Sequence, residues 1–507
     1  YTHALVQRLF GPGEFPLRMY GVFHFILSLI LMLLIIRELT DERERVRPLA
    51  LAAGAVLFLV NPLLLQHSVV INADNNILTS AILFFLFFLI RGERLNGDGY
   101  LRSRFILAGL FALCLWSKEM APLFMMAGII GFRLANREFE KALFDGVLIG
   151  VLGAVIFWSS WWAYCAASGT DLLGFVKFTM INKSKLAFSR GYLNGIFDVA
   201  FYGSRWNIFW AGAPFFLAIL GFLAARGRVF AATGKGERVD LIFVCAAAIW
   251  IPFQFFRPTI DMVKYQYPAY PLLIICIAWL FARIAGRRFG EERRVPGGMV
   301  MAALFGAVVV FTLHYYLIGD YLLALWAPLV RHLEGHFLFY YFLPIAAVCS
   351  VVAIASRGQR LRENLVIAMI IMAIPVNIGL DLNHAKADYA TTEIWLNYGE
   401  RGLRETAEYL RSQIKKSTIV SVRADIEYYL VYRYNLPARN IITPEKIFSL
   451  VDQRMVRALF AQVPIEYLVV DRISTNTRVV NGAAAVIEEY FTFDRQIGSF
   501  YVYRRAR

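Results

Sequence analysis

The stretch from residue 76 to residue 104 reads NILTSAILFFLFFLIRGERLNGDGYLRSR and decides the fold class. Its first part, 76–90, is almost entirely apolar, and the connection that follows carries Arg91, Arg94, Arg102 and Arg104. A long apolar run that ends in arginines is typical of a membrane helix that ends at the cytoplasmic surface, because Lys and Arg collect in cytoplasmic loops. The same pairing repeats along the chain, so the sequence predicts a polytopic membrane protein.

Apolar runs of this kind predict about twelve membrane spans. They lie near 20–36, 49–65, 76–90, 105–116, 119–133, 143–166, 206–225, 239–256, 266–285, 298–318, 337–355 and 364–380. Every second connection is basic, and these connections hold 23 Lys and Arg in all: 37–47, 91–104, 133–141, 226–238, 283–294 and 357–362. The short connections between them hold only Lys118, Arg257, Lys264 and Arg331, while the long loop 167–205 carries five basic residues. Since positive loops stay cytoplasmic, the second set and both termini face outward.

From Asp381 the sequence changes from long apolar runs to short helix-like and strand-like patterns. These patterns predict helices over 393–414 and 424–434 and from Thr443, strands over 418–422 and 466–470, and a hairpin over 491–504. Alternating strands and helices favour a parallel or mixed α/β domain, and about 125 residues suffice to bury a core. We therefore expect an α-helical polytopic membrane domain over 1–380 and a small extracytoplasmic α/β domain over 381–507.

The composition argues against several classes of function. Hydrophobic residues make up 59% of the chain and charged residues 18%, below the roughly one quarter of a soluble domain. The net charge of +15 lies mostly in cytoplasmic loops, so topology and anionic headgroups explain it better than a nucleic-acid partner does. The five cysteines fall in apolar runs without C-x-x-C spacing, and no G-x-x-x-x-G-K-[ST], G-x-S-x-G or H-E-x-x-H motif occurs. No redox or ATP site is indicated; no cofactor is expected with any certainty, and a divalent metal stays open.

Two polar groups stand where helices are predicted to meet the outer surface. Asp74 is the only acid in the loop 66–76, and a carboxylate there can orient an acceptor, accept a proton or bind a cation. The alternative is a cap for the helix that begins near Asn76. Lys118 and Glu119 separate two apolar runs, and a lysine there suits phosphate. The alternative is a local ion pair, or a side chain that extends to the surface.

Two further outer segments carry cations. Residues 257–271 place basic and tyrosine side chains at one membrane boundary, which suits an anionic substrate; an aromatic belt before a Pro-broken helix start is the alternative. The loop 167–205 breaks the positive-inside pattern, and the phosphate of a lipid-linked substrate would explain its cations, with headgroup contacts as the alternative. The candidate substrate-binding residues in these segments are Arg257, Lys264 and Tyr265, and Lys183, Lys185 and Arg190.

At these residues the chain resembles the integral-membrane glycosyltransferases of the GT-C class, specifically the relatives of bacterial aminoarabinose transferase and the protein O-mannosyltransferases. Four stretches carry the resemblance, in the family's order: Leu9-Phe-Gly to Arg18, Asn61-Pro62 to Asp74, Gly109 to Pro122 with Trp116-Ser-Lys118, and Lys264-Tyr265 to Pro271. The resemblance covers most of the chain. Glu119 departs from the glycine that usually follows the family's lysine.

The resemblance implies about thirteen membrane helices, an outward α/β domain and a sugar donor linked to dolichyl or undecaprenyl phosphate. It implies Asp74 as a catalytic residue and Lys118 and Tyr265 as substrate-binding residues. The family's principal catalytic Asp lies in the first outer loop, ahead of the position of Tyr1. Because the chain opens outside the membrane without an initiator Met or a signal peptide, we expect a preceding segment that holds the first helix and this loop.

The sequence thus predicts a multi-pass enzyme of the inner or plasma membrane that transfers a sugar to a lipid, protein or glycan acceptor on the outer face. Membrane lipids are its other expected partners. A secondary transporter would also fit about twelve spans, although the large outer domain and the lack of an evident repeat argue against it. A non-catalytic subunit of an envelope assembly, with a degenerate transferase fold, is the third alternative.

Overall fold

The computed structural model describes residues 14–40, 47–61, 74–118, 120–169, 236–256, 266–289, 402–422, 426–442, 453–471 and 486–506, with a few short gaps and some isolated residues besides. The spans predicted over 206–225, 298–318 and 337–355, and nearly all of 364–380, lie outside these residues. Contacts between Cα atoms divide the chain into two units, residues 18–385 and residues 386–507 together with 1–17.

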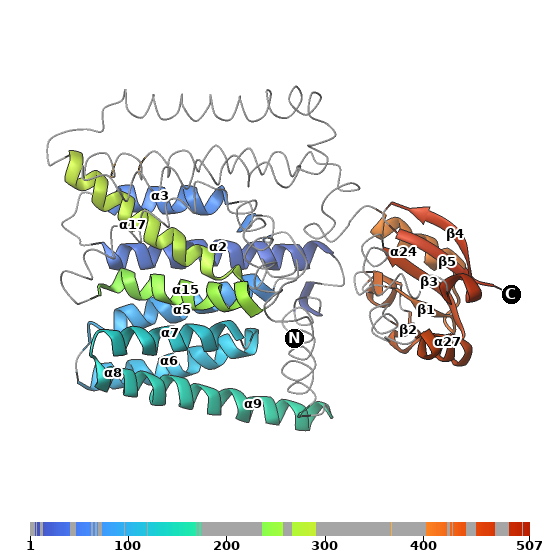
Figure 1. Ribbon diagram of the computed structural model, residues 1–507, viewed down its shortest axis with the longest axis horizontal. Coiled ribbons are helices and arrows are strands. Elements are labelled where there is room, and N and C mark those ends of the chain that lie inside the picture. The colour runs from blue at the N-terminus through green and yellow to red at the C-terminus, as the bar shows by residue number, and fades with distance from the viewer. Residues whose placement is uncertain are drawn as a thin grey trace. The chain divides into compact units, whose positions relative to one another are not determined.

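The first unit is built of long apolar helices that run roughly side by side (Figure 1). They are α2 (Glu14–Leu39), α3 (Arg47–Leu59), α5 (Asp74–Gly92), α6 (Asp98–Ser117), α7 (Met120–Ala135), α9 (Leu152–Ser168), α15 (Arg238–Phe256) and α17 (Ala269–Phe289). The short helix α8 (Phe139–Phe144) and the π-helical turn η1 (Asp145–Val151) continue directly into α9.

Within the described part of the chain, three helices are long and apolar enough to cross a membrane: 18–39, 98–117 and 139–168. Shorter apolar helices occupy 47–59, 76–92, 120–135 and 269–284. The protein is therefore a helical polytopic membrane protein, as the sequence predicts, while the total of about twelve spans stays a prediction.

Two predicted boundaries are wrong. The run 105–116 is only part of α6, which begins at Asp98, so Arg102 and Arg104 lie in a helix rather than in a loop. Arg104 can lie there because its charge is paired with an acid, described below. The run 49–65 ends early because α3 stops at Leu59, ahead of Asn61-Pro62, and the residue before a proline disfavours the helical conformation.

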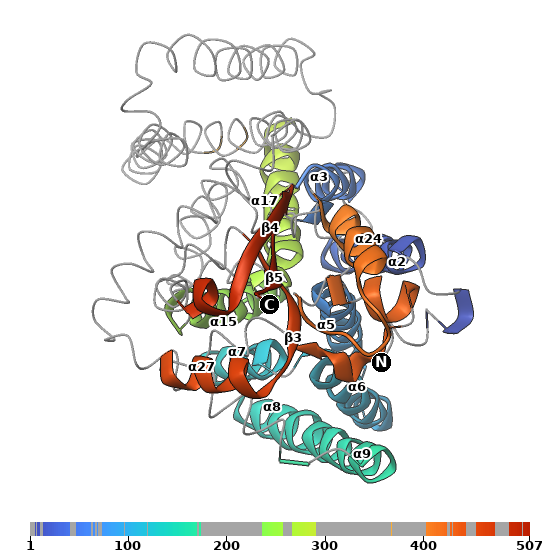
Figure 2. The ribbon, with the colours of Figure 1, turned by 90° about the vertical axis from the view of Figure 1, so that its right-hand side faces the viewer.

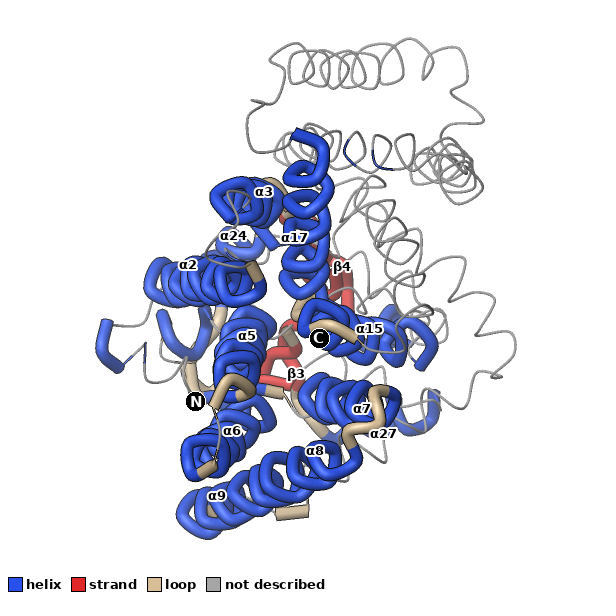
Figure 3. The backbone as a smooth tube through the Cα atoms, turned by 90° about the vertical axis from the view of Figure 1, so that its left-hand side faces the viewer, coloured by secondary structure: helices blue, strands red, loops and turns tan. Residues whose placement is uncertain are grey.

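The interior of the bundle is packed around α5. Its side chains Ile82, Leu83, Phe85, Leu86 and Leu89 are fully buried. Figure 3 looks along the helices and shows α5 between α2, α6 and α15. Small residues let other helices approach closely: a Cβ built on Gly128 of α7 would lie 2.8 Å from Ala248 Cβ of α15. Close backbone contact of this kind is common between membrane helices.

The second unit contains a mixed five-stranded sheet in the order β2-β1-β3-β5-β4. Its strands are β1 (Ile419–Ser421), β2 (Ile441–Ile442), β3 (Ile465–Asp471), β4 (Phe491–Ile497) and β5 (Phe500–Arg505). The strands β1, β2 and β3 are parallel, whereas β3, β5 and β4 are antiparallel. The strands predicted near 418–422 and 466–470 and the hairpin around Ile497-Gly498 are therefore present. Gly498 takes the positive φ of 57° that this tight turn requires.

Two helices cover opposite faces of this sheet (Figure 2). Side chains of α24 (Leu403–Gln413) share a core with Tyr467 and Val469 of β3, while α27 (Gln453–Gln462) shares a second core with Leu468 and Val470. Because successive side chains of a strand point to opposite faces, the two cores lie on opposite sides of β3. The helix predicted over 393–414 is described only as α24, and the helix predicted over 424–434 ends in a π-helical turn, Tyr429–Arg433.

Candidate functional site

The basic connections gather at one end of the helical bundle. Glu38 at the end of α2 pairs with Arg94, whose connection joins α5 and α6, at 2.9 Å. Arg238 at the start of α15 lies 3.8 Å from Glu93, and Arg283 of α17 lies 3.1 Å from Glu237. The predicted connections 37–47, 91–104 and 133–141, and the described parts of 226–238 and 283–294, therefore share an end. The connection 357–362 lies outside the described residues.

The opposite end holds the candidate residues that the structure describes. Asp74 is the first residue of α5, and its side chain is outside the described atoms, so its predicted roles as a base or a cap both stay open. Lys118 follows α6 in an extended conformation, with φ of −173°. Its backbone N–H donates the last hydrogen bond of the helix, to the backbone oxygen of Cys114. Its side chain is half-buried. Glu119, the predicted ion-pair partner of Lys118, lies outside the described residues.

The remaining predicted site residues are not among those described. Residues 257–265 and 174–235 fall outside the structural description, and they contain Arg257, Lys264, Tyr265, Lys183, Lys185 and Arg190. Gln266 and Tyr267, the first described residues before α17, are fully buried.

Tyr267 connects three segments at this end, and the sequence did not single it out. The Tyr267 side chain is 1% exposed. Its hydroxyl donates a hydrogen bond to Oδ1 of Asn76 in α5 and lies 3.3 Å from the backbone oxygen of Leu64. Leu64 belongs to the connection after α3, where Oδ1 of the buried Asn61 accepts its backbone N–H at 3.1 Å. The connection after α3, the start of α5 and the start of α17 are thereby joined.

Helix α2 packs closely against the same place. A Cβ built on Gly21 would lie 2.5 Å from the backbone oxygen of Ser68, so only glycine allows α2 to approach this connection so closely. One turn further along α2, Nδ1 of His24 is 2.7 Å from the hydroxyl of Ser80 in α5. Buried polar groups of this kind are hydrogen-bonded rather than left alone, which fixes how α2 faces α5.

Aromatic side chains fix the end of α6 beside Lys118. Nε1 of Trp116 donates to the Ser160 hydroxyl of α9 at 2.8 Å. The Trp116 ring also packs edge-on against Trp161 and Tyr164, with centroids 5.5 Å and 6.2 Å apart. Rings with a polar edge are typical of a membrane boundary, and here they hold the residue two positions before Lys118.

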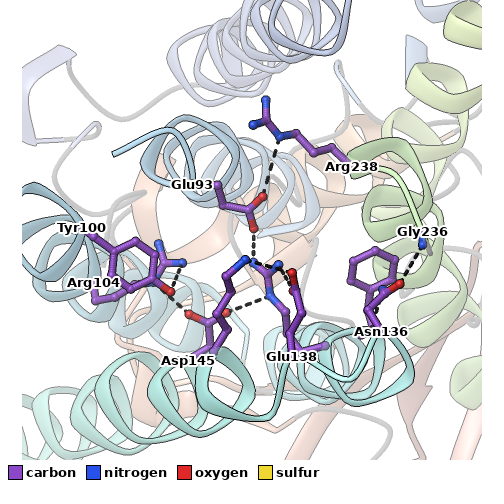
Figure 4. Close-up of polar contacts among 11 residues, drawn as sticks. Glu93, Tyr100, Arg104, Asn136, Glu138, Asp145, Gly236 and Arg238 are labelled. Atoms are coloured by element: carbon purple, nitrogen blue, oxygen red, sulfur yellow. Dashed lines mark hydrogen bonds and ion pairs between the residues drawn. The ribbon is translucent and has the colours of Figure 1, made fainter. Parts of the chain in front are cut away.

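An ion network lies at the opposite, basic end (Figure 4). Arg104 of α6 and Asp145 of η1 are both fully buried, with Nε and Oδ1 2.9 Å apart. Arg133 of α7 shares Asp145 through Nε at 3.3 Å, donates to Glu138 Oε2 at 2.7 Å and also pairs with Glu93. The network ties α5, α6, α7 and η1 together, and Arg238 of α15 reaches it through Glu93.

Further contacts complete this network. The Arg104 guanidinium donates to the Tyr100 hydroxyl at 2.8 Å and lies 3.9 Å from the centre of that ring. Partial burial would raise the pKa of Glu138, but hydrogen bonds from Lys141 and Arg133 outweigh it and lower the pKa. Three acids face three arginines, so the network has little net charge left to attract an ion, and we assign it an anchoring role.

Sequence signals for this network existed. Asp145 is an acid inside the apolar run 143–166, and ionisable residues in such runs usually have a partner. Among the described residues, no group of three or more His, Cys, Asp or Glu side chains is placed to hold a metal ion.

Comparison with known proteins gives a fold. Residues 1–164 match the family model described as dolichyl-phosphate-mannose-protein mannosyltransferase. Crystal structures of ArnT from Cupriavidus metallidurans match with TM-scores of 0.52, bound to undecaprenyl phosphate, and 0.56, in the apo state. The identities are 14% and 15%, and each match covers 98% of this chain and 85% of ArnT. The chain has the fold of ArnT. No curated protein matches it in sequence.

These matches confirm the resemblance to GT-C glycosyltransferases of the ArnT and protein mannosyltransferase type. The family model includes Asp74, Asn76, Lys118 and the residues of the ion network other than Arg238. Tyr267 lies outside the residues that the family model matches, and only the structural comparison with ArnT covers that part of the chain.

Proposed function

We propose that this protein is a glycosyltransferase that moves a sugar from a polyprenyl-phosphate donor to a lipid, protein or glycan acceptor at the outer face of the inner or plasma membrane. One observation carries the proposal. The start of α5 with Asp74, the end of α6 with Lys118 and the start of α17 lie at the end of the bundle opposite the basic connections. Since basic connections stay cytoplasmic, this end and the C-terminal α/β unit belong outside.

Sugar transfer requires two kinds of group at this end of the bundle, a base for the acceptor hydroxyl and cations for the phosphate. The oxygen of the acceptor hydroxyl forms a bond to the anomeric carbon while the bond from that carbon to the phosphate oxygen breaks. The electron pair leaves with the lipid phosphate, which needs cations nearby, and the hydroxyl proton passes to a base. We assign Asp74 to the acceptor side, where a carboxylate orients the hydroxyl or takes its proton. We assign Lys118 to the phosphate.

The other predicted cations complete the phosphate side of the proposal. Arg257, Lys264 and Tyr265 precede α17 in the sequence, and we assign them to the same phosphate. Charge interactions are stronger at the membrane boundary than in bulk water, so even one or two cations stabilise a departing phosphate substantially. Lys183, Lys185 and Arg190 are assigned to the phosphate or headgroup of the lipid donor.

The test is the Lys118→Ala variant. Removing one charge-stabilising donor from a leaving-group site costs roughly a hundred- to a thousandfold in turnover. We expect this loss in an assay of purified protein with radiolabelled polyprenyl-phosphate sugar and a lipid or peptide acceptor. Lys141→Ala is the matched control, because Lys141 is an exposed lysine at the basic end and pairs only with Glu138 among the described residues. It should keep normal turnover.

Three outcomes would contradict the proposal. Full activity of correctly folded Lys118→Ala would remove Lys118 from the phosphate site and leave the local pairing with Glu119 as the better account. Transport of a solute in liposomes without sugar transfer would favour the secondary transporter. Absence of transfer with every polyprenyl-phosphate sugar tested would favour a non-catalytic subunit.

A further inference from the structure

One side chain fastens the last turn of α6 to α9. Nε1 of Trp116 donates a hydrogen bond to the Ser160 hydroxyl at 2.8 Å. The Ser160 hydroxyl donates its own proton to the backbone oxygen of Phe157 at 2.9 Å. A hydroxyl has one proton and two lone pairs, so the Ser160 oxygen faces the indole as an acceptor. The two bonds together give the Trp116 side chain a defined direction relative to α9.

The Trp116 ring is also surrounded by aromatic rings of α9. Three of them meet it edge-on, with centroids 5.5 Å away for Trp161, 5.9 Å for Phe157 and 6.2 Å for Tyr164. Edge-to-face pairs at this spacing are favourable beyond the apolar area that they bury. A rotation of the indole would lose these contacts together with the hydrogen bond, so the position of Trp116 against α9 is well defined.

Helix α9 is a firm support because it is itself packed against α6. A Cβ built on Gly153 would lie 2.8 Å from the backbone oxygen of Ala108, so the two backbones touch in the middle of the helices. Toward the basic end, α9 continues from η1, whose Asp145 lies 2.9 Å from Arg104 of α6. The two helices are therefore joined at several points along their length, and Ser160 is presented from a support that is tied to α6.

Lys118 lies where this support reaches the end of α6. The helix ends at Ser117, and the backbone N–H of Lys118 still donates to Cys114 O at 3.0 Å. The backbone of Lys118 thus belongs to the turn that contains Trp116, and two residues of chain span at most about 7 Å. A cation that stabilises a departing phosphate is most effective when its position is set before the reaction.

We infer that Trp116 is a positioning residue, held by Ser160, that fixes the end of α6 so that Lys118 meets the phosphate of the lipid donor. This inference rests on the proposed function, in which Lys118 binds that phosphate. Trp116 acts through the residue two positions later and does not itself bind the phosphate. Loss of its hydrogen bond should therefore weaken recognition of the phosphate and leave recognition of the polyprenyl chain unchanged.

The experiment compares two lipids that differ only in charge. The probes are polyprenyl phosphate, the group that leaves in the proposed reaction, and the neutral polyprenol of the same chain length. The Kd of each lipid is measured with purified protein in detergent, and the ratio of the polyprenol Kd to the polyprenyl phosphate Kd defines the phosphate preference. We expect Trp116→Phe to lower this preference about fivefold, the factor for one hydrogen bond. A purely structural role would weaken binding of both lipids alike.

Ser160 and Trp158 supply matched variants. Ser160→Ala removes the acceptor of the indole N–H and should reproduce the loss of phosphate preference, whereas Ser160→Thr keeps a hydroxyl and should retain most of the preference. Trp158 is on the same helix, is 42% exposed, and packs edge-on against Phe157 at 5.5 Å. Trp158→Phe should leave the phosphate preference unchanged, which controls for a tryptophan substitution in this aromatic group.

A double variant shows whether Trp116 acts through Lys118. In protein that carries Lys118→Ala, Trp116→Phe should change the phosphate preference by less than about twofold, because the group that it positions is gone. The same fivefold loss in both backgrounds, or an unchanged preference in Trp116→Phe, would overturn the inference while the proposed function stands. An unmodified protein without phosphate preference, or a Lys118→Ala protein that keeps it in full, would overturn the assignment of Lys118 and the inference with it.

Discussion

Replacement of Asp145 by Asn should destabilise the helical bundle more than any exposed substitution. Asp145 is fully buried, and its two oxygens lie 2.9 Å from Arg104 Nε and 3.3 Å from Arg133 Nε. Arg133 keeps Glu93 and Glu138, but Arg104 loses the only acid that faces it within the described residues. Removing one partner of a buried pair costs roughly 3–5 kcal/mol, because an uncompensated buried charge remains. The contact of Arg104 with the Tyr100 ring is present in both proteins, so it does not offset this loss.

The assay is unfolding by SDS in mixed micelles, followed through tryptophan fluorescence. Lys141→Ala is the control, because the Lys141–Glu138 pair is exposed and such pairs contribute only about 0–1 kcal/mol. The double variant Arg104→Met with Asp145→Leu removes both charges and should lose less free energy of unfolding than Asp145→Asn. If Asp145→Asn loses no more than Lys141→Ala, the network does not anchor the bundle.

Three further outcomes are expected. Gly402→Ala should destabilise the C-terminal unit by more than about 1 kcal/mol, because Gly402 has a φ of 83° and a Cβ there would lie 2.4 Å from the Ile497 carbonyl oxygen. Faster hydrogen exchange in β4 would show this loss of stability, and unchanged exchange would contradict it. Burial and the hydrogen bond to Asp494 raise the pKa of Tyr409 from 10.0 to about 12. The contribution of Tyr409 to stability is therefore present below pH 10 and is lost as the pH rises through about 12. In a titration followed by phenolate absorbance, the step near pH 12 should be missing in Tyr409→Phe. A membrane-impermeant maleimide added to intact cells should label Ser412→Cys and leave Glu140→Cys unlabelled, because both positions are exposed and the proposed topology assigns them to opposite sides of the membrane. The reverse result would overturn this topology.

The arrangement of the described helix ends could be predicted from charge alone. The sequence shows that arginine and lysine are concentrated in every second connection. In the structure the described basic connections lie at one end of the bundle and are linked by ion pairs. The acids in those pairs were not predicted, because a count of basic residues ignores which carboxylates lie nearby. Arg104 shows the consequence: it was expected in a loop, but its pairing with Asp145 lets it lie inside α6.

The candidate site was predicted by segment rather than by residue. The sequence points to Asp74 and Tyr265, which stay predictions, and it gives no sign that Tyr267 contacts Asn76. Several tyrosines follow one another at the start of α17, and nothing local distinguishes the one whose hydroxyl meets Asn76. That contact depends on how two distant helices pack, which a pattern of apolar runs does not contain.

The two ends of the bundle are held by different kinds of interaction, so a tilt of α5 about its basic end would move its other end. Several ion pairs connect the helices at the basic end, and neutral hydrogen bonds such as those of Tyr267 with Asn76 and of His24 with Ser80 connect helices at the other end. Helix α5 has 19 residues and is about 28 Å long. A tilt of about 5° around the end that the ion pairs hold would move Asp74 by about 2.5 Å. A small rotation about the basic end is therefore enough to change the position of Asp74 relative to the neighbouring helices.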